Sequence, residues 1–161
     1  MTTAQYNNCV DLFSDGVYRF ILHNIRDKDE AKDIVQDTFE KLWKNCEAVD
    51  FTKAKSYIFT TAHHTMIDKI RKNKRISRME EGMEDMQYHE EQYSDVQEHV
   101  QRALTKLPEA QRSVILLRDF EGYDYREIGQ ITGFTESQVK VYIYRGRMFL
   151  KEYLGSLQNV L

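Results

Sequence analysis

Two groups of side chains in this sequence have the chemistry that binding to nucleic acid requires. The first is a basic run, whose cationic groups can contact phosphates and make binding depend on salt. It comprises Lys69, Arg71, Lys72, Lys74, Arg75 and Arg78. The second, near the C-terminus, mixes basic, hydrogen-bonding and small apolar side chains of the kinds that contact base edges. It comprises Ser137, Gln138, Lys140, Val141, Tyr144, Arg145 and Arg147.

The second group is carried by a pattern typical of a helix-turn-helix. Asp124 is a favourable N-cap, and Glu127 three residues later completes the sequence of a capping box. Gly133 suits the left-handed turn that ends a helix, and Thr135 with Gln138 forms a second capping box. A short helix, a glycine turn and a second helix make up the unit that enters a DNA major groove.

Apolar spacing predicts which side of the second helix faces outward. Val139 and Ile143, four residues apart, should point into the core and leave the second group exposed. There we expect Arg145 to read guanine, Val141 to pack against a thymine methyl group and Arg147 to contact phosphate. An ordinary corner between two helices would have the same pattern, so the rest of the chain must decide between these interpretations.

Composition favours a helix-rich protein that stays in the cytoplasm. The 161 residues allow one domain or two small ones, 30% are charged and there is a single proline. No apolar run approaches the roughly 18 residues that span a membrane, and the first residues lack the pattern of a secretory signal. Cys9 and Cys46 are isolated, without metal-binding spacing, which suits a reducing compartment.

Charge is distributed unevenly, although the net charge is only −3. The basic run is followed at once by an acidic stretch, and no lysine or arginine occurs between Arg78 and Arg102. We expect a basic patch next to an acidic segment, which the net charge conceals.

Hydrophobic periodicity predicts an all-α fold of two small helical domains joined by an acidic flexible linker, with a helix-turn-helix ending the second. In the first domain, 1–75, helices are expected near 4–24, 29–44 and 53–74, with a loop at about 45–52. The linker covers 76–99, where composition favours a solvated segment. Met79, Met83 and Met86 recur there at helical spacing, so a small docking face is the alternative.

The second domain, 100–161, is expected to contain a helix that begins at Pro108 and leads into the helix-turn-helix. Its buried stripe should consist of Val114, Ile115, Leu117 and Phe120. We find no pattern that predicts a strand.

This order of features resembles the bacterial RNA polymerase sigma factors of the extracytoplasmic-function type, the smallest members of the primary sigma family. The resemblance spans about 12–155. Residues 29–43 are similar to the family's region two, and 56–72 to the helix that melts and reads the upstream promoter element near the start site. Residues 107–128 are similar to region four, and 138–147 to its recognition helix.

The resemblance implies two partners, namely promoter DNA and core RNA polymerase through its largest and second-largest subunits. It places polymerase docking, on the clamp helices of the largest subunit, on Asp33, Gln36, Asp37 and Glu40. Without the resemblance, a solvated helix face would be the simpler interpretation. It also implies an acidic linker that threads toward the RNA exit path and a chain that is monomeric when free. Whether an anti-sigma factor is a further partner stays open. No enzymatic activity, cofactor or metal is expected.

Melting a promoter requires a place for an unstacked base. Aromatic and imidazole rings can stack on such a base or hydrogen-bond to it, and the candidates are Phe51, Tyr57, His63 and His64. The phosphate contacts are assigned to Lys69, Arg71, Lys72, Lys74 and Arg75. Tyr57 could instead belong to the core. A metal site at His63 and His64 is disfavoured because adjacent helical residues diverge by about 100°.

The sequence departs from the family's common residues where bases would be read. Tyr57 stands in place of a frequent tryptophan, and His64 in place of an asparagine. Val141 and Tyr142 replace a serine–arginine pair, which leaves the promoter preference open. Gly129 and Gly146 replace alanines, and Gly129 should let a second helix cross closely.

Two other functions explain less of the sequence. A stand-alone helix-turn-helix regulator, usually a dimer, would explain 124–147 but neither the first domain nor the basic and acidic segments. A small helical enzyme would need a nucleophile elbow, metal-ligand spacing or a glycine-rich phosphate loop, and the sequence contains none of these.

Overall fold

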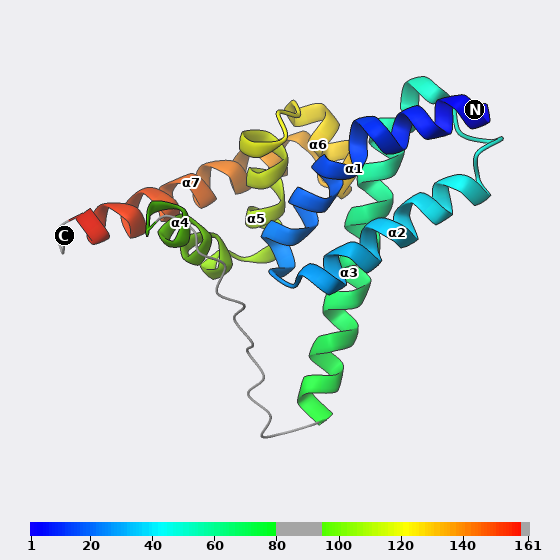
Figure 1. Cartoon of the computed structure of the whole chain (residues 1–161). Coiled ribbons are helices and arrows are strands. Elements are labelled where there is room, and N and C mark those ends of the chain that lie inside the picture. The colour runs from blue at the N-terminus through cyan, green and yellow to red at the C-terminus, as the bar shows by residue number, and fades with distance from the viewer. Residues whose placement is uncertain (80–94, 159–161) are drawn as a thin grey trace. The chain divides into compact units, whose positions relative to one another are not determined.

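Every regular element in the described residues is a helix, which confirms the predicted all-α fold. The computed structural model describes 1–79 and 95–158, and contacts divide the chain into two units, Met1–Glu90 and Glu91–Leu161 (Figure 1). The predictions for 80–94, which cover most of the predicted linker together with Met83 and Met86, concern residues outside the described ones. Within the described parts, no helix has the length and apolar character needed to cross a membrane.

The first unit is a bundle of three long helices with one short 3-10 turn. Its elements are α1 (Thr3–Ile25), α2 (Lys28–Lys44), η1 (Phe51–Lys53) and α3 (Ala54–Met79). Thr2 and Gln5 form a capping box at the start of α1, and Asp27 caps α2 by accepting from the Glu30 amide at 3.1 Å. Figure 1 shows the last turns of α3 extending past α2, and this helix continues beyond its predicted end at Lys74.

Apolar side chains from all three helices fill the core of this unit. Phe20, Ile21, Ile34, Leu42, Ile58 and Met66 are among those with no exposed surface. Trp43, near the end of α2, is 50% exposed and lies at the rim of this core. Its ring packs edge-on against Tyr6 at 4.9 Å between centroids, and the Tyr6 hydroxyl donates to the Phe39 carbonyl at 3.0 Å. The apolar stripe of α2 is therefore partly completed by a ring from α1.

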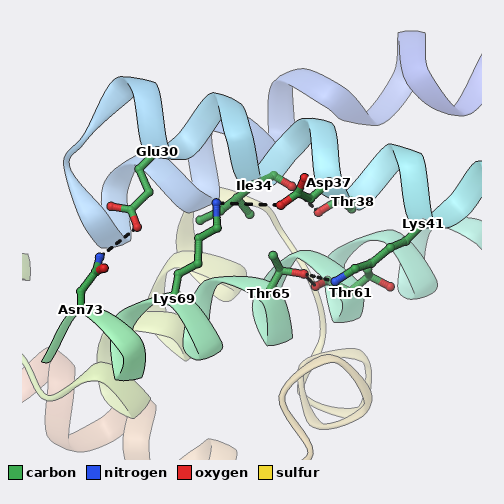
Figure 2. A network of polar contacts seen from close by, with 9 residues as sticks. All are labelled: Glu30, Ile34, Asp37, Thr38, Lys41, Thr61, Thr65, Lys69 and Asn73. Atoms are coloured by element: carbon green, nitrogen blue, oxygen red, sulfur yellow. Dashed lines mark hydrogen bonds and ion pairs between the residues drawn. The ribbon is translucent and has the colours of Figure 1, made fainter. Parts of the chain in front are cut away.

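Three polar contacts join α2 to α3 along their exposed edge (Figure 2). The amide of Asn73 donates to Glu30 at 3.0 Å, and Lys41 donates to the Thr65 hydroxyl at 3.0 Å. Between them, Lys69 lies 3.9 Å from the Asp37 carboxylate. Solvent-exposed pairs of this kind contribute at most about 1 kcal/mol each, so their main effect is to fix the register of the two helices.

The second unit packs four α-helices and one π-helical turn. Its elements are α4 (Asp95–Lys106), α5 (Glu109–Ile115), η2 (Leu116–Phe120), α6 (Tyr125–Thr132) and α7 (Glu136–Gln158). Pro108 stands at the N-cap of α5, as predicted. Gly146 has no room for a Cβ atom, which would lie 2.2 Å from Cδ1 of Ile115. The two helices α5 and α7 therefore pack closely at this glycine.

The π-helical turn corrects one predicted core residue. The Glu121 amide donates to the Leu116 carbonyl at 3.1 Å, a bond over five residues that shifts the phase of the helix after Ile115. Leu116 and Leu117 are consequently both buried, while Phe120 is 43% exposed. The prediction that Phe120 belongs to the buried stripe was wrong because it assumed an uninterrupted α-helix.

His63 lies inside the first unit, where it does not present its ring to a partner. It is 6% exposed, its ring centroid is 6.4 Å from that of Phe20, and its Nδ1 atom has no hydrogen-bond partner within the described residues. Burial first, and the neighbouring His64 second, lower the pKa of His63 from 6.5 to about 4. His63 therefore belongs to the core of the first unit and is not a residue that contacts a base.

We predict that the first unit loses stability as the pH falls from 6.5 toward 4, because the unfolded chain binds a proton at His63 that the folded chain does not. The loss attributable to this group reaches about 3 kcal/mol at the lower limit. Urea unfolding followed by Trp43 fluorescence measures it, because Trp43 is the single tryptophan of the chain and reports this unit alone.

His63→Gln should remove this part of the pH dependence, whereas the exposed control His64→Gln should retain it. Identical pH dependence in the wild-type and His63→Gln proteins would contradict the assignment.

Candidate nucleic-acid interface

The caps and the turn of α6 and α7 follow the predicted pattern, except that Glu127 does not return a side-chain bond to the Asp124 amide within the described residues. The Asp124 carboxylate accepts from the backbone amide of Glu127 at 2.8 Å. The backbone amide of Thr135 donates to Oε1 of Gln138 at 2.9 Å, and the backbone amide of Gln138 donates to Oγ1 of Thr135 at 3.1 Å. Gly133 has a φ of 81° and donates to the Gly129 carbonyl at 2.9 Å. Gly129 is also required, since a Cβ there would lie 2.9 Å from the Phe134 carbonyl oxygen. Gly129 therefore makes room for the backbone of the turn, and the prediction that it makes room for a crossing helix was wrong.

The outward side of α7 carries the whole predicted DNA-binding group. Val139 and Ile143 are buried, which confirms the predicted phase. The exposed residues are Ser137, Gln138, Lys140, Val141, Tyr144, Arg145 and Arg147. Sequence reasoning missed Met148, which is 42% exposed. It follows Val141 by seven residues, or two helical turns, and this spacing was the available signal.

The three cations of this group differ in how far they are already paired. Arg147 makes a bidentate contact with Asp119, with Nε 3.3 Å from Oδ2 and Nη2 2.5 Å from Oδ1. This hydrogen bond is the main cause that raises the pKa of Arg147. Lys140 lies 3.9 Å from Glu136. Arg145 is exposed and makes no ion pair with any residue that the structure describes, so its guanidinium is available to an external acceptor.

The basic run lies on the free end of α3. Every residue from Arg71 to Met79 is exposed. Neither hydrogen bonds nor ion pairs tie Arg71, Lys72, Lys74 or Arg75 to another described residue, whereas Lys69 is held by Asp37. This end of the helix therefore presents unpaired positive charge of the kind that binds a phosphate backbone.

A short capped loop presents the aromatic residue that precedes α3. The Asp50 carboxylate accepts from both the amide and the hydroxyl of Thr52, at 3.0 and 2.9 Å, and these bonds lower the pKa of Asp50. Phe51, enclosed by this cap, is 36% exposed. The Asp50 carboxylate thus caps the turn that precedes α3, and part of the Phe51 ring is accessible to a partner.

The other ring candidates differ in accessibility. His64 is exposed on α3, one residue beyond the buried His63. Tyr57 is half-buried, and its hydroxyl accepts from the Asn45 amide at 3.1 Å, which joins the end of α2 to α3. The structure therefore leaves Phe51 and His64 as the more accessible candidates.

The predicted polymerase face lies along one side of α2. Asp33, Gln36 and Glu40 are exposed and Asp37 is half-buried. Glu40 pairs with Lys44 at 3.2 Å, and Asp37 meets Lys69 at 3.9 Å (Figure 2). This acidic face and the basic end of α3 therefore adjoin at the Asp37–Lys69 pair. Within 1–79 and 95–158, no three histidine, cysteine or carboxylate side chains lie close enough to hold a metal ion.

Comparison with known proteins accounts for both units. Residues 9–76 match Sigma-70 region 2, and 97–150 match Sigma-70, region 4. The chain is 30% identical to the RNA polymerase sigma factor SigV of Bacillus subtilis over 155 residues, which covers 93% of this chain and 91% of SigV. It is 26% identical to the ECF RNA polymerase sigma factor SigM of the same bacterium, over 87% of this chain and 89% of SigM.

A solved structure gives the same result. The sigma factor RpoE of Bartonella quintana, crystallised with the anti-sigma factor NepR, superimposes with a TM-score of 0.81 and 26% identity. The match covers 93% of this chain and 96% of that one.

Proposed function

The chain belongs to the extracytoplasmic-function group of RNA polymerase sigma factors, and we propose a division of labour between the two units by which it directs promoter-specific transcription initiation. The first unit docks on core polymerase and holds the opened upstream element, while the second reads the distal element. The observation that carries this proposal is that α3 and α7, from different units, each present exposed cations and also bury apolar side chains in the core of their own unit.

In the first unit, α2 would supply the polymerase contact through Asp33, Gln36, Asp37 and Glu40. The adjoining end of α3 would hold phosphates through Arg71, Lys72, Lys74 and Arg75, and Phe51 and His64 would receive an unstacked base. The contact between α2 and α3 at Asp37 and Lys69 supports this arrangement, since it brings the polymerase face and the DNA face next to each other.

In the second unit, α7 would enter the major groove with its exposed side. Arg145 suits guanine, Val141 can meet a thymine methyl group, and Ser137 and Gln138 supply hydrogen-bonding groups near the start of the helix. Because Gln138 already caps α7 through its side-chain oxygen, its remaining amide hydrogens are what it can offer to a base. A stand-alone regulator is not favoured, because it leaves the region 2 unit without a role.

The same assignment implies further partners and conditions. The chain would work in the cytoplasm, where polymerase is found, and would contribute no catalytic group of its own. Bartonella quintana RpoE was crystallised with an anti-sigma factor, and we propose a partner of that class here. The exposed Val141, Tyr144 and Met148 would suit it, since covering their apolar surface would also block the reading side of α7.

We predict that Arg145→Ala weakens promoter-specific transcription by about 5- to 150-fold, because a bidentate arginine–guanine contact is worth about 1–3 kcal/mol. The exposed arginine has no described partner, so the thermal unfolding of the protein should be unchanged. Run-off transcription with reconstituted polymerase measures the first effect and circular dichroism the second.

Arg102→Ala is the matched control, because this arginine is exposed on α4 and pairs with Glu98 in the same unit. Full promoter activity of the Arg145→Ala protein with unchanged stability would rule out the assigned contact.

We predict that Asp37→Asn lowers the affinity for core polymerase about tenfold while changing the free energy of unfolding by less than about 1 kcal/mol. The pair with Lys69 is long and partly exposed, so its loss should hardly affect folding. Trp43 fluorescence follows the folding of this unit, and anisotropy of a labelled chain follows polymerase binding.

Glu47→Gln serves as the control, since Glu47 is an exposed carboxylate just past the end of α2. Equal affinities of the wild-type, Asp37→Asn and Glu47→Gln proteins would show that this face of α2 is merely solvated.

A further inference from the structure

Tyr125 brings together cations from two other elements of the second unit. It is the first residue of α6 and is half-buried. The guanidinium carbon of Arg118, in η2, lies 5.0 Å from the centroid of its ring, and Nζ of Lys140, in α7, lies 5.8 Å from it. Both distances fall within the roughly 6 Å over which a ring attracts a cation. The ring of Tyr125, in α6, thus contacts one cation from η2 and one from α7.

Each of these two cations has a second contact that limits its freedom. Arg118 donates from Nη1 to the Tyr123 carbonyl at 3.0 Å, so its guanidinium is held by the ring and by backbone. Lys140 lies 3.9 Å from Glu136, one turn earlier on α7. Long basic side chains otherwise sample many rotamers, and ordering them before binding reduces the entropy lost on binding.

A third cation adjoins the same place. Arg147 lies seven residues after Lys140, which places the two on the same side of α7. Its guanidinium is held by Asp119, the residue next to Arg118. After Asp119, Tyr125 also contributes to the raised pKa of Arg147. We call Arg118, Lys140 and Arg147 the cation rim of the helix-turn-helix.

The chemistry of the ring distinguishes Tyr125 from the carboxylates nearby. Asp119 and Glu136 hold Arg147 and Lys140 by neutralising charge, so they compete with a phosphate for the same cation. An aromatic face holds a cation through its quadrupole and leaves the positive charge in place. Tyr125 can therefore order Arg118 and Lys140 without weakening their attraction for DNA.

We infer that Tyr125 is a positioning residue, which holds two cations of the rim, Arg118 and Lys140, in place to receive DNA phosphates beside the reading side of α7. This inference rests on the proposed function of the second unit and deepens it. It adds Arg118 to the phosphate contacts, and it gives α6 a part in orienting side chains that α7 presents.

The test compares Tyr125→Leu with Tyr125→Phe in the wild-type and Lys140→Met backgrounds. Binding of the full-length chain to a labelled duplex of random sequence is measured over a range of salt concentrations, because phosphate contacts do not depend on sequence. Tyr125→Phe keeps the ring face and should bind within about twofold of wild type. Tyr125→Leu should bind about three- to tenfold more weakly and with a shallower salt dependence.

The decisive comparison is the Lys140→Met background, where the effect of Tyr125→Leu should shrink by at least half because one of the two held cations is gone. Tyr153→Leu is the matched control. Its ring also lies under a lysine, with Nζ of Lys106 at 5.3 Å, but about 20 Å farther along α7. DNA binding by this variant should remain within about twofold of wild type.

An equal loss of DNA binding from Tyr125→Leu in both backgrounds, with a lowered melting temperature, would mean that Tyr125 only packs and would overturn the inference. Wild-type binding retained by Tyr125→Leu would overturn it too. If the folded wild-type chain binds no duplex even at low salt, the proposed DNA binding by the second unit is wrong. The inference about Tyr125 is then wrong as well.

Discussion

The backbone turn between α6 and α7 is the constraint on which the reading surface depends. Gly133 adopts a left-handed conformation that only glycine accepts readily, and Gly129 leaves space that the Phe134 carbonyl fills. With the turn fixed, the Thr135–Gln138 capping box sets the residue at which α7 begins. The position of that first residue then determines which side chains of α7 are buried, as Val139 and Ile143 are, and which side chains are exposed to contact DNA.

Local rules predicted most of the fold, because caps, glycine turns and apolar spacing act within a few residues of one another. They failed where the answer lies in tertiary structure. The π-helical turn that exposes Phe120 has no sequence signature, and the spacing along α3 could not tell the buried His63 from the exposed His64. The contacts of Tyr125 likewise arise only when η2, α6 and α7 are packed together, so the sequence alone did not predict a role for this residue.

Pairing within the protein divides the basic residues into two kinds. Lys69 and Arg147 are held by carboxylates, at Asp37 and Asp119, whereas Arg145 and the cations from Arg71 to Arg75 on α3 make no such pair in the described residues. A DNA phosphate must compete with a carboxylate to bind cations of the first kind, whereas it can bind cations of the second kind directly. The net charge of −3 is therefore a poor guide to DNA binding, because individual pairs decide where positive charge is available.

The central claim is that this chain directs polymerase to promoters by holding two elements with two units. Transcription of a bacterial genomic library by core polymerase, with and without the chain, tests it most directly when the RNA 5′ ends are sequenced. The claim predicts discrete start sites that appear only when the chain is added, each preceded by the same two sequence elements at near-constant spacing. No RNA above the level of core polymerase alone, or start sites that share no upstream elements, would contradict it.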